Sequence, residues 1–206
     1  MKQRAGDAGA NAREAILAAA RKAAQAHGYG GLNIRALADG VGIKGASIYY
    51  HFPSKADLGA AVARRYWEDS AADLDALWDE TSDPLRCLHD YPDVFRKSLE
   101  SENRLCLCSF MAAEYDDLPD VVKREVQAFA DVHVAWLSKM LFASSVVSAG
   151  ESGQRARAIY AAVAGAQLMA RSRSDIALYD ALIDGYRAAG LLPTLQRTLP
   201  EPGVDH

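Results

Sequence analysis

The sequence has few of the residues that build disulfide-bonded or membrane-spanning proteins. Its three cysteines, Cys87, Cys106 and Cys108, are too few and too unevenly spaced for a disulfide framework. No apolar run approaches the roughly 18 residues of a membrane span, and residues 1–15 lack the apolar core of a signal peptide. We therefore expect a soluble protein in a reducing, cytoplasmic setting.

Catalytic motifs are also absent. The sequence contains no Gly-rich phosphate loop, no H-E-x-x-H motif and no Ser nucleophile elbow. The pair Cys106 and Cys108 would send its thiols to opposite faces of a helix, which is a poor arrangement for chelating one metal ion. We expect no catalytic residue, no cofactor and no metal site, and an enzyme is the weakest of the candidate functions.

The alternation of apolar and polar residues that is typical of β-strands is missing as well. Hydrophobic residues make up 50% of the 206 residues and are dominated by Ala and Leu, which favours an all-α protein. The length suggests one small domain and one larger helical domain. Expected helices cover about 11–28, 34–40, 45–51, 54–78, 120–147, 152–172 and 175–189, with a further start at 83–84, a break at Pro92, a mobile arm over 1–10 and an irregular tail holding Pro193, Pro200 and Pro202.

Charge is distributed unevenly along the chain. Residues 1–58 hold eight Lys and Arg against four Asp and Glu, a balance of +4, whereas the remainder holds 15 against 23, a balance of -8. A basic first domain on an acidic second domain is typical of a protein that meets phosphates with one end only.

Residues 34–55, which read IRALADGVGIKGASIYYHFPSK, indicate two short helices around a tight turn. Asn33 can cap the first helix, and Gly40 and Gly42 can end it. In the second helix Ile48 and Phe52 are four residues apart and should point into a core. The other faces of that helix are then free to meet a partner.

The longer stretch GYGGLNIRALADGVGIKGASIYYHFPSKADL resembles the DNA-binding head of the TetR family of one-component transcriptional regulators. The resemblance implies an all-α fold with a three-helix helix-turn-helix domain over residues 1–58 and a helical ligand-binding and dimerisation domain over residues 59–206. The matching positions are Gly28, Tyr29, Ile34, Leu37, Ala38, Gly42, Ser47, Ile48, Tyr49, Phe52, Lys55 and Leu58.

A short helix with an exposed polar face can enter a major groove, which is about 12 Å wide. The resemblance implies phosphate contacts from Tyr49, His51 and Lys55. It also implies base contacts from residues 44–46 and Tyr50. Arg35 has the alternative of being a solvated surface charge. The residues expected at the DNA are Asn33, Arg35, Lys44, Gly45, Ala46, Ser47, Tyr49, Tyr50, His51 and Lys55.

The second domain carries the aromatic and sulfur side chains that could line a ligand cavity, as the resemblance implies. For any one of them, a place in the hydrophobic core is the more frequent alternative, and His133 is more often a satisfied core histidine than a ligand. The candidates are Trp67, Phe95, Cys106, Phe110, Met111, Tyr115, Phe129, His133 and Trp136.

Cys106 has a further possible role. The stretch RLCLCSFMAAE resembles a branch of the family in which a cysteine at this position senses electrophiles or oxidants. Arg104 and Lys97 could lower the pKa of its thiol. The alternative is that Cys106 is a small buried hydrophobic residue.

The last two expected helices carry more apolar residues than one wall of a helical bundle needs. We interpret the excess as a homodimer interface. Its candidate residues are Ile159, Val163, Ala166, Ile176, Leu182 and Ile183.

These features together predict a DNA-binding transcriptional regulator. Its dimer would bind a palindromic operator, usually as a repressor, and would be released by a small ligand or by thiol modification. The rival hypothesis is a ligand-binding or scaffold helical protein without DNA function. DNA binding in low salt distinguishes the two.

Overall fold

The computed structural model describes the backbone of residues 2–195 and the side chains of residues 11–195, and this range contains helices and no strand. The all-α prediction is confirmed. Within this range no helix is both long enough and apolar enough to span a bilayer. The helices are α1 (Lys2–His27), α2 (Ile34–Val41), α3 (Gly45–His51), α4 (Lys55–Thr81), α5 (Pro84–Asp90), α6 (Pro92–Glu100), α7 (Leu107–Ala113), α8 (Asp120–Ala143), α9 (Ala149–Arg173) and α10 (Ile176–Ala188), with a 3-10 turn at Tyr115–Asp117.

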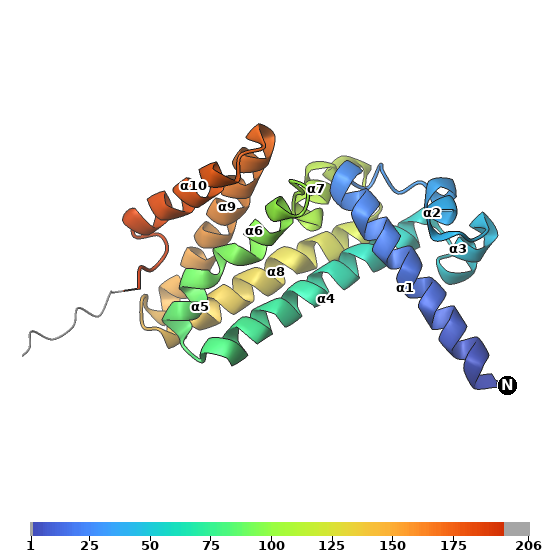
Figure 1. Cartoon of the computed structure of the whole chain (residues 1–206). Helices are drawn as coiled ribbons and strands as arrows, with labels where there is room; N and C mark the ends of the chain where they lie inside the picture. Colours follow the sequence, from blue (N-terminus) through green and yellow to red (C-terminus); the bar gives the residue numbers. More distant parts are fainter. Residues whose placement is uncertain (1, 196–206) are drawn as a thin grey trace, which may run out of the picture.

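The first three helices form a small head at one end of the molecule (Figure 1). α1 packs against α2, α3 and α4. The buried face of α1 carries mostly small side chains, because Ile16 and Ala20 are followed by further alanines. The neighbouring helices can therefore approach α1 closely. Leu37, Ile48 and Phe52 are buried in the same core, as their spacing predicted.

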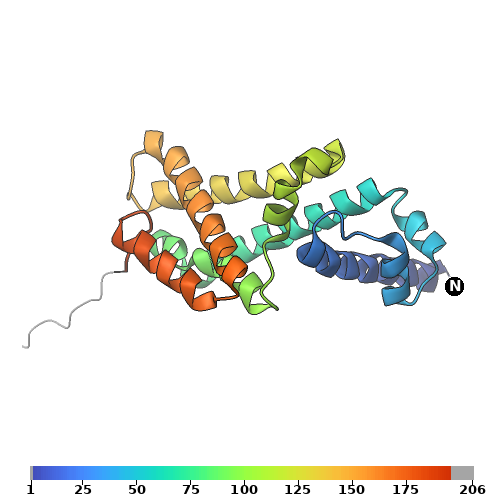
Figure 2. The same ribbon diagram turned by 90° about the horizontal axis from the view of Figure 1, so that it is seen from above.

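The remaining helices form a larger body around α8. α4 leaves the head and lies along α8, and α8 packs in turn against α9. α10 packs on α9 and α6, while α5 and α7 pack against α8. Seen from above, the head lies at one end and α4 reaches from it into the body (Figure 2). One helix is therefore shared by both parts.

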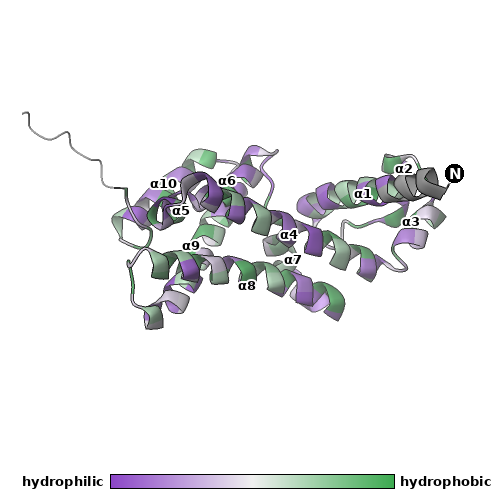
Figure 3. Ribbon diagram, turned by 90° about the horizontal axis from the view of Figure 1, so that it is seen from below, coloured by the Kyte–Doolittle hydropathy of each residue, from purple (hydrophilic) through white to green (hydrophobic). Residues whose placement is uncertain are grey.

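The helices of the body are amphipathic. Figure 3 shows hydrophilic and hydrophobic residues mixed along the visible sides of α4 and α8. On α4 the buried residues Val62, Tyr66, Ser70 and Leu74 recur every four positions, which places them on one face of the helix. That face looks toward α8.

Short polar side chains fix where several helices begin. The side chains of Asn33 and Ser54 each accept a hydrogen bond from the backbone N–H three residues later, at 3.0 and 3.1 Å. Asp83 and Asp175 cap α5 and α10 in the same way. These bonds satisfy N–H groups that a helix start leaves unpaired. The predicted starts at these four residues are confirmed.

The start of α1 differs from the prediction. The helix begins at Lys2, so the expected N-cap at Asn11 and the expected mobile arm over residues 2–10 are wrong. Ala, Arg and Gln in this stretch favour a helix, and no proline interrupts it.

The connection between α8 and α9 lies earlier in the chain than predicted, because α8 ends at Ala143 rather than near Val147. α9 begins at Ala149, before the predicted start near Ser152, and includes both Gly150 and Gly153. Ser148 and Glu151 form a capping box, which stabilises the first turn despite these glycines. Pro200 and Pro202 of the expected tail lie outside the described residues.

Candidate DNA-binding head and ligand cavity

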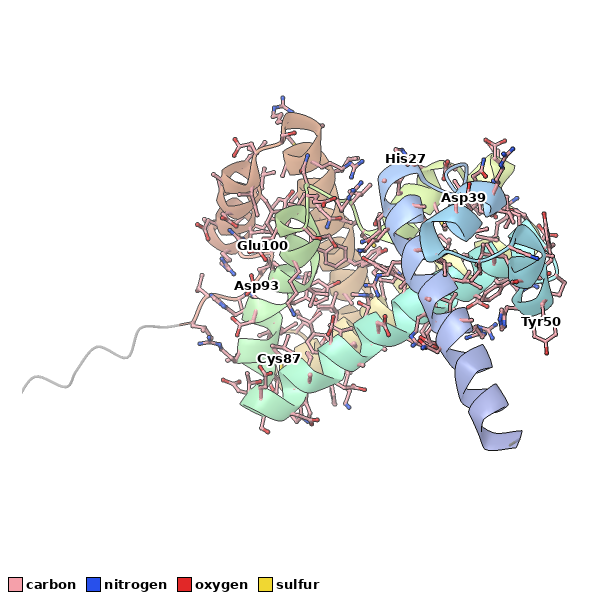
Figure 4. All side chains as sticks on the ribbon, turned by 45° about the vertical axis from the view of Figure 1, so that its right-hand side comes forward. His27, Asp39, Tyr50, Cys87, Asp93 and Glu100 are labelled. Carbon is pink, nitrogen blue, oxygen red and sulfur yellow. The ribbon has the colours of Figure 1, made fainter. Side chains whose placement is uncertain are left out.

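α3 turns a polar and aromatic face away from the head. Lys44 and Ala46 are exposed, and Tyr49 and Tyr50 are 52% and 85% exposed. Figure 4 shows Tyr50 projecting outward from the end of the molecule. The Tyr50 ring contributes little to the packing of the head, and about half of Tyr49 is left in water. This face is therefore available to a partner.

Groups that favour an anion flank this face. Lys55 begins α4, and its ammonium lies 4.6 Å from the centre of the Tyr29 ring. Backbone N–H groups at the start of a long helix attract anions, and so does the helix dipole. His51 lies beside them, with its ring edge-on to that of Tyr50 at 5.2 Å between centroids. A phosphate would meet favourable charge here.

The remaining predicted DNA contacts are less free than the sequence suggested. Asn33 uses its side-chain oxygen to cap α2, so only its amide NH2 could reach a phosphate. Gly45 and Ser47 are partly buried. Arg35 is exposed and makes no ion pair with any residue that the structure describes. Both alternatives for Arg35 therefore stay open.

A carboxylate from the body caps the turn that follows α1. Glu114 accepts a hydrogen bond from the Tyr29 N–H at 2.6 Å and a longer one from the Gly30 N–H at 3.5 Å. Gly28 adopts φ +66°, and a Cβ at this position would lie 2.1 Å from the Glu114 carboxylate. Gly28 is thus required by both its backbone conformation and its neighbour. We call this contact the Glu114 joint.

The sequence did not predict the Glu114 joint. Its glycines indicate a turn, but a partner 85 residues away leaves no local signal.

α7 connects this joint to the interior of the body. Its C-cap is Glu114 and its N-cap is Cys106. The Cys106 N–H donates to the side-chain oxygen of Gln167 at 3.0 Å, and the amide of Gln167 donates to the Phe95 carbonyl at 2.6 Å. Both ends of this seven-residue helix are therefore held by hydrogen bonds.

A cavity of about 300 Å³ opens between α1, α4, α6 and α8. This volume is at the small end of the range for ligand pockets. Phe95, Cys106 and Phe129 line it, as expected. The other lining residues are Arg21, Gln25, Tyr66, Ser70, Asp73, Val94, Lys97, Ser98 and Ser101.

Six of the nine expected ligand residues do not line this cavity. His133 is fully buried behind its wall, with Nε2 2.9 Å from Ser70 Oγ and Nδ1 3.0 Å from the Tyr91 hydroxyl. Burial lowers the pKa of His133 to about 3. Met111 and Trp136 belong to the core, as the alternative reading held.

The other three face different surroundings. Trp67 donates its indole N–H to Glu125 at 2.9 Å. Phe110 lies under the Arg171 guanidinium at 5.4 Å. The exposed ring of Tyr115 lies under the Lys123 ammonium at 4.5 Å. Their aromatic character gave no indication of which side of a helix they occupy.

The thiol of Cys106 does not have the properties of an activated cysteine. Cys106 is 2% exposed, and burial raises the pKa of its thiol. Arg104 instead pairs with Glu102 at 2.5 Å. The expectation that Arg104 and Lys97 lower this pKa is wrong, because desolvation has the larger effect.

The expected dimer residues face the interior of their own chain. Ile159, Val163 and Ala166 are fully buried and Ile183 is 3% exposed. The other two, Ile176 and Leu182, are partly buried and pack against the same core. For Ile159, Val163, Ala166 and Ile183 the assignment is wrong, because α9 has apolar residues on two faces and periodicity alone cannot tell which of them faces inward. For Ile176 and Leu182 it stays a prediction.

An exposed apolar face nevertheless exists on the same two helices. Leu168 and Met169 of α9 are 57% and 45% exposed. Ala161 and Gly165, seven and three positions before Leu168 on α9, are small and exposed and would let another helix approach closely, and Ala177 and Ala181 are small exposed residues of α10. We call this the α9–α10 face, and its further members are Ala161, Gly165, Ala177 and Ala181.

Comparisons with known proteins agree with this geometry. A family model described as bacterial regulatory proteins of the tetR family matches residues 16–62, which contain the helix-turn-helix. The structure superimposes on a TetR-family transcriptional regulator from Agrobacterium tumefaciens with a TM-score of 0.81 and 29% identity, over 88% of this chain and 98% of that one. Residues 16–62 thus match the DNA-binding domain of the TetR family, and the described chain has the fold of TetR-family regulators.

Two further relatives extend the comparison. A TetR transcriptional regulator from Legionella pneumophila matches with a TM-score of 0.79 and 29% identity, over 85% of this chain and 95% of that one. The HTH-type transcriptional repressor AcnR from Corynebacterium glutamicum is 40% identical over 67 residues, which are 32% of this chain and 34% of AcnR. The chain thus matches about a third of the length of this curated relative. These similarities support a DNA-binding transcriptional regulator.

Proposed function

We propose that this TetR-family protein represses transcription as a homodimer and leaves its operator when a small molecule fills the cavity between α1, α4, α6 and α8. The observation that carries the proposal is the exposed face of α3, with Tyr49 and Tyr50 in water and Lys55 beside them. Repression is supported by the name of the relative AcnR, which is a transcriptional repressor.

The head would bind DNA by inserting α3 into the major groove. Lys44, Ala46 and Tyr50 would face the base edges, while Tyr49, His51 and Lys55 would hold the phosphates on either side. Ala46 offers no hydrogen-bonding group and Lys44 is a flexible point charge. DNA shape would therefore contribute much of the sequence preference. Residues 1–58 would form this unit, with the boundary inside α4.

The α9–α10 face supports the dimer. Leu168 and Met169 are large apolar side chains that one chain leaves in water. In a two-fold dimer the same face of each subunit would bury the other, and small neighbours would let the helices pack closely. Two heads held in this way would place their α3 helices about 34 Å apart, one turn of DNA.

The cavity supports a ligand-controlled switch. It is lined by α4, which begins at the phosphate site, and by Cys106, from which α7 leads to the Glu114 joint. A ligand that binds better when α4 or α7 takes another position would therefore shift the position of the head. A coupling of about 1 to 3 kcal/mol would weaken DNA binding by about 5- to 150-fold. Because the Cys106 thiol is buried and its pKa is raised, these contacts favour ligand binding over thiol modification as the route of release.

The DNA-binding proposal can be tested by fluorescence anisotropy with labelled DNA from the region upstream of the protein's own gene. A Tyr49→Ala, Lys55→Ala variant should lose most of its affinity for DNA. The slope of the logarithm of the binding constant against the logarithm of the salt concentration should decrease by about one, which corresponds to one lost phosphate contact. Tyr115→Ala with Lys123→Ala is the matched control, because it removes another exposed tyrosine and lysine pair, 4.5 Å apart, from the body.

Equal losses in the two double variants would contradict the proposed docking face. Absence of any binding at low salt would favour a ligand-binding or scaffold protein instead. The distinction between a regulator and an enzyme requires a search for turnover in the absence of DNA.

A further inference from the structure

Three buried polar side chains form a chain that ends in the cavity. Ser70 lies in the cavity wall, and its Oγ is 2.9 Å from His133 Nε2. The other ring nitrogen, Nδ1, is 3.0 Å from the hydroxyl of Tyr91. His133 and Tyr91 are fully buried, and the rings of Phe129 and Phe95 pack on the imidazole at 4.3 and 5.5 Å between centroids. The imidazole is therefore fixed between two hydroxyl groups.

The positions of the hydrogens on His133, Tyr91 and Ser70 are set by the need of each buried donor for an acceptor. Burial lowers the pKa of His133 to about 3, so the neutral ring carries one hydrogen at neutral pH. If Nδ1 carried this hydrogen, Nδ1–H would donate a hydrogen bond to the Tyr91 hydroxyl. Its own hydrogen would then be buried without an acceptor among the described residues. An unpaired buried donor is strongly disfavoured.

The opposite arrangement leaves no buried donor unpaired. The Tyr91 hydroxyl donates to Nδ1, and Nε2–H donates to Ser70 Oγ. The Ser70 hydroxyl hydrogen then has no acceptor in the part of the chain that the structure describes, and Ser70 borders the cavity. Water or a ligand in the cavity can accept it. The structure therefore favours a serine that donates into the cavity.

Two further hydroxyl groups border the cavity. They belong to Tyr66, which is 8% exposed, and to Ser98, which is partly exposed. Phe95 and Phe129 supply apolar surface. The interior thus offers aromatic walls and, at Ser70, a hydroxyl group whose oxygen is fixed by His133.

The charged groups of the cavity are less buried. Lys97 and Asp73 are exposed, and the partly exposed Arg21 pairs with Asp69 at 2.7 Å. They are more hydrated than the interior groups and select less strongly between ligands.

We propose that the cavity binds a small molecule with an apolar, ring-sized body and an acceptor oxygen, of the carbonyl type, that receives the hydroxyl hydrogen of Ser70. This inference rests on the proposed function, in which the same cavity holds the effector. His133 and Tyr91 are positioning residues, because they act on the ligand only through Ser70. A ligand that presents a donor but no acceptor at this point would meet the serine hydrogen and bind less well.

The hydrogen arrangement can be tested without any ligand. Long-range ¹H–¹⁵N spectra of the ¹⁵N-histidine-labelled protein distinguish a ring protonated at Nε2 from one protonated at Nδ1. The signals of His133 are assigned by their loss in a His133→Gln variant. We expect the Nε2–H tautomer at pH 7, and an Nδ1–H tautomer would overturn the inference.

The ligand class is tested with a matched pair of probes, 4-fluoroacetophenone and 1-ethyl-4-fluorobenzene, whose binding is followed by ¹⁹F NMR. The two differ in the acceptor oxygen. Ser70→Ala should weaken binding of the ketone about fivefold to tenfold relative to the hydrocarbon. Ser98→Ala is the matched control and should leave the ratio of the two affinities unchanged.

Equal effects of Ser70→Ala on both probes would overturn the proposal, and so would the failure of both probes to bind at millimolar concentration. Operator binding measured on the same samples keeps the proposed function separate. A protein that binds DNA but neither probe retains its function as a regulator and loses only the ligand class inferred here.

Discussion

The Glu114 joint predicts a strong energetic coupling between two residues that are far apart in the sequence. Gly28→Ala forces an L-residue into the left-handed region, which costs about 1–2 kcal/mol. The new Cβ would lie 2.1 Å from the Glu114 carboxylate, so the carboxylate must leave the Tyr29 N–H. A hydrogen bond to a charged group contributes about 1.5–3 kcal/mol, and the lower value applies because Glu114 is partly exposed. Gly28→Ala should therefore lower the free energy of unfolding by about 3 kcal/mol.

A double-mutant cycle separates the two contributions. In a Glu114→Ala background the clash is absent and the hydrogen bond is already lost. Gly28→Ala should then cost only about 1–2 kcal/mol. Urea unfolding followed by far-UV circular dichroism measures all four proteins.

Gly42→Ala is the control for backbone strain alone. Gly42 also has a positive φ, of +76°, but among the residues that the structure describes no atom beyond its local backbone lies within 4 Å of the position that a Cβ would take. Its cost should be the same with and without Glu114. A coupling below about 0.5 kcal/mol between Gly28→Ala and Glu114→Ala would refute the joint.

Three further predictions concern the body. Cys106 should react with iodoacetamide at pH 7.5 far more slowly than free cysteine, because burial raises the pKa of its thiol. If one site is instead labelled rapidly, and this labelling is lost in Cys106→Ser, the sensor hypothesis would be restored. The folded-state pKa of His133, about 3, lies below its unfolded value, so the contribution of His133 to stability is complete above pH 6.5 and is lost as the pH falls. Urea titrations should show that the free energy of unfolding falls by about 2 kcal/mol by pH 5. The His133→Gln variant should not show this decrease. Leu168→Glu should shift the protein toward monomer in sedimentation velocity, because it places a charge in the proposed α9–α10 face, whereas Phe142→Glu, a change at another exposed apolar residue (60%), should not.

The head could be predicted closely because its signals are local. Asn33 caps α2 and Gly42 ends it, and each acts within a few residues along the chain. The bounds of α3 and the burial of Ile48 and Phe52 followed from spacing alone. Local rules of capping and periodicity therefore sufficed for this part of the fold.

The body was harder to predict because its important contacts join distant residues. Tyr66 and Ser70 are four residues apart on α4, a spacing that placed them on one face but could not show that a cavity lay in front of it. Ile159 and Val163 form an apolar stripe, yet only the packing against α8 and α10 decides that this stripe faces inward. Aromatic character pointed equally to Phe95 and Phe129, which line the cavity, and to Trp67, which does not, because core, cavity and surface rings share this character.

The position of Ser70 along α4 gives the helix the properties of a lever. Ser70 is 15 residues from Lys55, which corresponds to about 22 Å along a helix. A tilt of about 5° with its pivot at the cavity would displace the start of the helix by about 2 Å over that length. In a symmetric dimer the two displacements would add, so a tilt of about 5° would give a mismatch of about 4 Å with the spacing of the DNA grooves.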